Sequence, residues 1–153
     1  MSWPMWGASY PAGNKQEIGP VPDFVESAVR AALNLGGIAD ITTTGRVTGR
    51  RHRIEIYFHQ FDGELYLTGR PGWKRDWMAN IEANPEFTLH LKRGIKADIA
   101  VRGTPEPDPE VRRKILFRAL TESWGSDPER VRGALDRWVE SAPFIRFEPI
   151  DQV

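Results

Sequence analysis

The 153-residue chain contains no cysteine, and this absence removes several kinds of chemistry at once. Without thiols the protein has no disulfide framework, no thiolate nucleophile and no cysteine-ligated metal, as is usual in a reducing compartment such as the cytoplasm. The three histidines, His52, His59 and His90, lack the spacing of metal ligands. The sequence therefore predicts no metal site.

The chain also lacks net charge and long apolar runs. Its 21 basic residues balance 21 acidic residues, so no overall field draws it to nucleic acid or membrane. No apolar run approaches the roughly 18 residues of a spanning helix, and the first residues lack the pattern of a signal peptide. We expect a soluble, cytoplasmic protein without stable membrane insertion, in which any electrostatic function depends on a local cluster.

The length fits one ordinary domain. Residues 1–20 mix proline, glycine and polar residues with Trp3, Trp6 and Tyr10, a composition that breaks regular structure. We interpret residues 1–20 as an N-terminal arm and residues 21–153 as a single domain. The arm either packs on that domain, covers a ligand or makes peripheral contact with a membrane.

Alternating apolar residues predict six short strands, and helical periodicity predicts one helix before the first strand and three between later strands. The expected strands are 38–44, 51–60, 64–68, 86–91, 96–101 and 144–150. Asp62-Gly63 favours a tight hairpin. The expected helices begin after Asp23, near residue 73, near Val111 and at Asp127-Pro128. Because strands and helices do not alternate regularly, this order favours a closed or nearly closed antiparallel barrel over a doubly wound sheet.

A basic turn precedes the second strand. Residues 44–53 contain four arginines, no acidic residue and two glycines. Glycine allows backbone N–H groups to converge on an anion, and arginine donates to phosphate or carboxylate oxygens. The turn therefore predicts an anion site, although a basic hairpin tip on a solvated surface has the same composition.

A second stretch, residues 68–80, strengthens the anion interpretation. Gly69 and Gly72 end a strand, and Lys74 and Arg75 follow at an expected helix start, where unpaired N–H groups favour negative charge. If the first and third strands are neighbours, the two loops bracket one elongated, acidic ligand. Trp77 either covers a flat ring of that ligand or belongs to the core.

The order of these motifs resembles the deazaflavin-dependent nitroreductase family of actinobacteria. The quoted segments are "TTTGRVTGRRHRIEIYF" and "GELYLTGRPGWKRDWMANIEANPEFTLHL". The resemblance covers about residues 38–103 and implies a six-stranded antiparallel split β-barrel with flanking helices, like the FMN-binding split barrels. It departs from the family's usual pattern at Val47, where lysine or arginine is typical.

The resemblance also implies a cofactor site for coenzyme F420, whose tail carries phosphate and glutamates. The matching residues of the first loop are Arg46, Thr48, Gly49, Arg50, Arg51, His52 and Arg53. Those of the second loop and helix are Thr68, Gly69, Arg70, Gly72, Lys74, Arg75, Trp77 and Asn80. Trp124, Trp138 and Phe144 are candidates for a wall beside the acceptor, and no catalytic acid is predicted.

The resemblance implies an oxidoreductase that transfers a hydride from reduced F420 to a quinone, a coumarin-like lactone or a nitroaromatic. Two alternatives stay open: an FMN-binding split barrel that catalyses redox chemistry or stores flavin, and a small barrel that binds single-stranded nucleic acid. The nucleic-acid alternative ranks last because the basic residues lie in loops, not among aromatic residues on a sheet face. The protein is expected to be a monomer or a homodimer.

Overall fold

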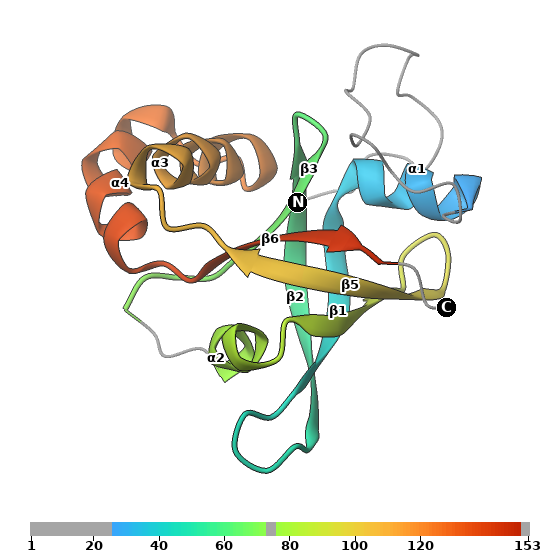
Figure 1. Ribbon diagram of the computed structural model, residues 1–153. Helices are drawn as coiled ribbons and strands as arrows, with labels where there is room; N and C mark the ends of the chain where they lie inside the picture. The colour runs from blue at the N-terminus through green and yellow to red at the C-terminus, as the bar shows by residue number, and fades with distance from the viewer. Residues whose placement is uncertain (1–25, 73–75, 151–153) are drawn as a thin grey trace.

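Six antiparallel strands close into a barrel in the order β1-β2-β3-β6-β5-β4 (Figure 1). The computed structural model describes residues 26–72 and 76–150, so the predicted arm, Lys74 and Arg75 lie outside the described residues. The strands are β1 (Gly37–Thr44), β2 (Arg51–Phe61), β3 (Glu64–Thr68), β4 (Glu86–Leu91), β5 (Ala97–Pro105) and β6 (Phe144–Pro149). The predicted six-stranded antiparallel barrel is confirmed.

The barrel interior holds the first of two apolar cores. Alternate residues of each strand point inward, as the period of two in a strand requires. Ile41 of β1, Phe58 of β2 and Leu89 of β4 are almost fully buried there, and Trp77 of helix α2 (Asp76–Ala83) joins the same cluster. Trp77 therefore packs into the core, as one of the two roles that the sequence allowed requires.

A tight turn joins β2 to β3. Asp62 and Gly63 both have positive φ, at 53° and 84°, as expected for the predicted two-residue hairpin between β2 and β3. The longer β1–β2 turn is different: β1 and β2 stay paired up to Thr44 and Arg51, and the first five residues of β2 are exposed. In Figure 1 this hairpin projects from the barrel on the side of α2.

The helices begin close to their predicted signals. Asp108 and Asp127 cap α3 (Pro109–Arg118) and α4 (Pro128–Ser141), each accepting a hydrogen bond from a backbone N–H of the first turn. A π-helical turn, η1 (Ala119–Ser123), follows α3. Helix α1 (Ser27–Leu35) has Glu26 at its N-cap without a side-chain cap bond, and Asp23 lies outside the described residues.

A second core lies between the barrel and the α3–α4 pair. Phe61 and Tyr66, on the outer side of β2 and β3, pack there with helical residues such as Leu116 and Leu135. Phe144 of β6 belongs to this core and has no exposed surface. Its predicted place in a substrate wall is therefore wrong, because its side chain points into the helix–sheet interface instead of an open surface.

Two further expectations need correction. Strands β1 and β3 are not neighbours, since β2 lies between them and β1 pairs with β4 on its other edge. Strand β5 also runs on to Pro105, beyond the predicted end at 101. Helix α2 packs against β5 at Gly103, where an added Cβ would lie 2.8 Å from Ile81 Cγ2. That glycine allows the close approach of helix and strand.

Candidate functional site

A cleft of about 860 Å³ opens between β2, the β3–α2 loop and the helical layer. Ile54 and Ile56 of β2 form one side, and Ile56 also packs against the barrel core. Trp77 lies in the lining as well, so the cleft adjoins the barrel interior. Its size falls in the range of ligand pockets.

Two tryptophans form the helical side of this cleft. Trp124 follows η1, and Trp138 lies on α4; their ring centroids are 6.4 Å apart. Trp124 keeps 36% of its surface exposed, which is unusual for so large an apolar side chain. The predicted wall is thus partly correct, since Trp124 and Trp138 line the cleft whereas Phe144 does not.

His59 of β2 packs against the ring of Trp124. Its ring centroid lies 5.0 Å from that of Trp124, and its Nδ1 is 2.9 Å from Ser123 Oγ in the π-helical turn. Burial lowers the pKa of His59 to about 3, because a charged imidazole would lose its hydration. His59 Nε2 is buried without a hydrogen-bond partner among the described residues. The sequence placed His59 in a strand but gave no sign of this position.

The basic hairpin does not line the cleft but is joined to α2 by Arg46. The backbone N–H and Nη1 of Arg46 donate to Asn80 Oδ1 at 3.1 and 3.0 Å, and its Nη2 lies 3.4 Å from Asp76 Oδ1. Asn80 is buried and donates in turn to Thr43 Oγ1 at 3.2 Å. The first predicted loop therefore lies against α2, held by Asn80, while β1 and β3 are separated by β2.

The tip of the hairpin is open to solvent. Gly49 has φ +74° and nothing within 4 Å of a Cβ placed on it, and Thr48 Oγ1 accepts from the backbone N–H of Arg50. Arg50 and Arg51 are exposed, and no ion pair within residues 26–72 and 76–150 engages them. These two guanidinium groups can therefore meet an external anion.

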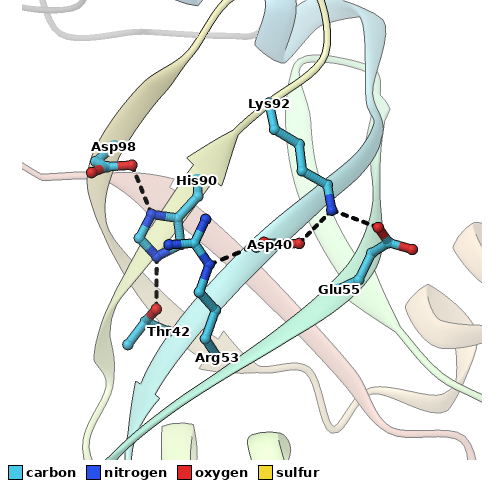
Figure 2. Close-up of polar contacts among 7 residues, drawn as sticks. All are labelled: Asp40, Thr42, Arg53, Glu55, His90, Lys92 and Asp98. Atoms are coloured by element: carbon cyan, nitrogen blue, oxygen red, sulfur yellow. Dashed lines mark hydrogen bonds and ion pairs between the residues drawn. The ribbon is translucent and has the colours of Figure 1, made fainter.

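Arg53 lies on the outer face of the barrel, where it joins a network of charged residues (Figure 2). Its Nε donates to Asp40 Oδ2 at 3.0 Å, and Lys92 Nζ donates to Asp40 Oδ1 at 2.7 Å and to Glu55. The hydrogen bond from Lys92, followed by that from Arg53, lowers the pKa of Asp40. Arg53 is thus already paired with a carboxylate of its own chain.

Two histidines lie near this part of the barrel. His90 bonds to Thr42 Oγ1 through Nε2 and to Asp98 Oδ1 through Nδ1, both at 2.7 Å (Figure 2). His52, next to Arg53 in β2, is exposed and lies close to Gly45. Within the part of the chain that the structure describes, no three potential ligands gather as a metal would require.

The β3–α2 loop borders the cleft at its other side. Thr68, Gly69 and Arg70 line the cleft, but the Thr68 hydroxyl donates to the carbonyl oxygen of Pro143 at 2.8 Å and is buried. Arg70 is exposed, and no described carboxylate pairs with it. Gly72 has φ +75°, a conformation that favours glycine.

Comparison with known proteins decides the family. The model of the F420H(2)-dependent quinone reductase family matches residues 25–132, which include five of the six strands, α2, α3 and the beginning of α4. The chain belongs to this family. It is therefore related to oxidoreductases that use reduced F420. No curated protein sequence matches the chain significantly.

Among the described residues, no helix has the length and apolar character needed to cross a membrane.

Solved structures share the fold of this reductase-family chain at low sequence identity. A conserved hypothetical protein from Mycobacterium tuberculosis has TM-score 0.61 and 14% identity, with 90% of each chain covered. A putative pyridoxamine 5′-phosphate oxidase from Listeria innocua has TM-score 0.56 and 15% identity over 81% of this chain and 92% of that one. A putative 5-nitroimidazole antibiotic resistance protein from Bacteroides thetaiotaomicron has TM-score 0.54 and 13% identity, covering 76% and 74%.

The residues present fit a deazaflavin with an anionic tail. The apolar side chains of Ile54 and Ile56 line the cleft together with tryptophans, a composition suited to a flat ring. Arg70 stands at the border of the cleft, and Arg50 and Arg51 stand on the hairpin beyond α2, all exposed. The apolar cleft and these exposed guanidinium groups together match a ligand that is flat at one end and negatively charged at the other.

Proposed function

We propose that the protein transfers a hydride from reduced F420 to a small electrophilic acceptor such as a quinone, a coumarin-like lactone or a nitroaromatic. The family match supports the oxidoreductase chemistry. The observation that carries the proposal is an apolar, tryptophan-walled cleft bordered by the exposed Arg70 of the β3–α2 loop, in a protein whose β1–β2 hairpin presents the exposed Arg50 and Arg51.

In this proposal the cleft holds the ring and the arginines hold the tail. Bound F420H2 supplies the hydride, so the protein's task is to orient, to exclude water and to bind charge. Ile54 and Ile56 would support one face of the ring, while Trp124 and Trp138 would keep water from the reacting atoms. Arg50, Arg51 and Arg70 would bind phosphate and carboxylate oxygens of the tail.

The acceptor needs little further chemistry from the protein. A quinone takes up the hydride and one proton from solvent to give the hydroquinone. His59 is buried and neutral near pH 7, so its imidazole is not a source of that proton. We therefore assign no catalytic acid, and we place the specificity of the reaction in the walls of the cleft.

A binding and turnover experiment tests this function. F420, FMN and FAD are titrated separately against the protein, and binding is followed by the fluorescence of each flavin or deazaflavin. F420H2 is then mixed with protein and a quinone, a coumarin or a nitroaromatic, and the return of oxidised F420 is recorded. We expect F420 to bind more tightly than FMN, with enzyme-dependent oxidation of F420H2. Tighter binding of FMN without turnover of F420H2 would favour the FMN-binding alternative.

A further inference from the structure

Arg137 of α4 reaches into the cleft from the helical side. It lines the cleft together with its neighbour Trp138, and its Nη2 lies 3.4 Å from the position of a Cβ built on Gly72. The guanidinium group therefore extends from the helical layer to the β3–α2 loop, at the edge of the space that the ligands would occupy. The sequence gave no signal for this residue, because only the packing of α4 places it there.

Most arginines of the helical layer have partners in the protein. Arg113 pairs with Asp136, Arg118 with Asp62 and Glu122, and Arg132 with Glu129. These contacts use part of the positive charge that α3 and α4 present to solvent. Arg137 differs, since none of the ion pairs or hydrogen bonds found within residues 26–72 and 76–150 involves its side chain.

The acidic residue of the cleft does not neutralise the positive charge of Arg137. Glu55 is the carboxylate among the described lining residues, and Lys92 binds it from the outer face of the barrel (Figure 2). The cleft thus has guanidinium groups at Arg70 on the loop side and Arg137 on the helical side. An anionic group in the cleft would meet unpaired donors on both sides.

Arg137 and the tryptophans differ in what they can bind. Trp138 and Trp124 offer flat apolar surface on the same wall, with ring centroids 6.4 Å apart. An aromatic acceptor can lie against this surface while a negative substituent reaches the guanidinium group. The hairpin arginines cannot serve the same substituent, because none of them lines the cleft.

We propose that Arg137 is a specificity-determining residue that selects planar acceptors carrying a negatively charged substituent, such as a carboxylate, sulfonate or ionised hydroxyl. This inference rests on the proposed function, because it assumes that the acceptor occupies the tryptophan-walled side of the cleft. The bond between guanidinium and anion forms on binding and is not part of hydride transfer. In this proposal Arg137 acts on the affinity for the acceptor, whereas Arg70 on the opposite side binds the cofactor tail.

The test compares two acceptors in three proteins. The acceptors are 1,4-naphthoquinone and 1,4-naphthoquinone-2-sulfonate, which share a ring system and differ in charge. The proteins are the wild type, Arg137→Gln and the control Arg130→Gln, which changes an exposed arginine of the same helix outside the cleft lining. For each protein the ratio of kcat/KM for the sulfonate to kcat/KM for the neutral quinone is measured. Intrinsic differences between the two acceptors cancel when this ratio is compared between proteins.

We expect Arg137→Gln to lower this ratio about tenfold or more, mainly through KM for the sulfonate, since a hydrogen bond to a charged group is lost. Arg130→Gln should leave the ratio unchanged. The wild-type preference should also shrink as salt rises, because an exposed ion pair is screened. An unchanged ratio in Arg137→Gln would overturn the proposal, and so would weaker F420 binding in that variant, which would assign Arg137 to the cofactor tail.

A binding measurement separates this inference from the proposed function. Quenching of tryptophan fluorescence by the sulfonate is titrated without cofactor in the wild type and in Arg137→Gln. Weaker binding in the variant supports the acceptor site even if F420H2 is not oxidised by the wild type, in which case the proposed reaction alone fails. Equal quenching curves for the two proteins would overturn the role of Arg137, whatever the turnover.

Discussion

The hairpin and the cleft are built in opposite ways. The β1–β2 hairpin is exposed, rich in arginine, and held to α2 by hydrogen bonds of Arg46 and Asn80. The cleft is walled by apolar side chains that rest on two buried cores. The difference indicates two separate roles. The arginines of the hairpin provide affinity for a ligand's charged tail, and the rigid walls of the cleft orient its reacting ring.

Substitution of Asn80 should break the link between the hairpin and α2. Asn80 is 2% exposed. Its Oδ1 accepts hydrogen bonds from the backbone N–H and the guanidinium group of Arg46, and its Nδ2 donates to the Thr43 hydroxyl. Asn80→Ala should lower the free energy of unfolding by about 2 to 4 kcal/mol, since buried polar groups lose their partners. F420 affinity should fall as well. Urea unfolding and F420 titration measure the two effects.

Asn84→Ala is the matched control for this change. Asn84 directly follows α2, the helix that contains Asn80, but its side chain makes one long bond of 3.4 Å to the carbonyl oxygen of Thr44. The control should lose less stability than Asn80→Ala and should keep its affinity for F420. Equal losses in the two variants would show that Asn80 has no special role in joining the hairpin to α2.

Substitution of Arg50 should affect the hairpin region alone. Arg50→Ala should weaken F420 binding by about 1.5 to 3 kcal/mol, the worth of a hydrogen bond to a charged group. Stability and KM for a neutral quinone should stay near their wild-type values, because the Arg50 side chain is exposed. Fluorescence titration of F420 measures the change, with Arg130→Ala as control. Wild-type affinity in Arg50→Ala would place the tail elsewhere.

Acidification should affect the cleft region through His59. Its pKa is about 3 in the folded protein, against about 6.5 when unfolded, so between these values the unfolded chain binds a proton that the folded protein does not. Stability is therefore lost as pH falls below 6.5. Between pH 7 and pH 5 this single group should lower the free energy of unfolding by about 2 kcal/mol.

The variant His59→Gln isolates that contribution. Glutamine does not titrate but can still bond to Ser123 Oγ, the partner of His59 Nδ1. Urea unfolding at pH 7 and pH 5 should show a smaller loss of stability in the variant than in the wild type. If the two proteins lose the same stability, His59 is not buried in a neutral form.

A substitution at Val47 should produce the smallest effect. Val47 is 86% exposed on the hairpin, where the related family usually carries lysine or arginine. Val47→Lys should tighten F420 binding by roughly 0.5 kcal/mol, typical of an exposed ion pair, and the gain should vanish at high salt. Val47→Gln serves as the uncharged control. A gain of equal size for glutamine would argue against an electrostatic cause.

Local sequence patterns were sufficient to predict the barrel. Alternating residues in β2 and β4, the Asp62-Gly63 turn and the Asp127-Pro128 helix start all specify structure within a few residues of themselves. Strand order needed more than local information: β1 pairs with β4 across the closure of the barrel, and no local signal reports that pairing.

The candidate site depends even more on distant partners. The arginines of the turn look alike in sequence, yet Arg46 binds Asn80, Arg53 binds Asp40, and Arg50 has no ion pair among the described residues. The π-helical turn that places Trp124, and the packing of α4 that places Arg137, likewise arise only when the helical layer closes on the barrel. Residue type predicted the chemistry of the site, but not which residues are available to a ligand.

The most direct test of the division between the hairpin and the cleft compares complete F420 with a deazaflavin that ends before the phosphate. Both ligands are titrated by fluorescence against the wild type and Arg50→Ala. We predict that the wild type binds complete F420 more tightly than the truncated ligand, and that Arg50→Ala weakens only the complete ligand. Equal affinity of the wild type for both ligands would contradict the account.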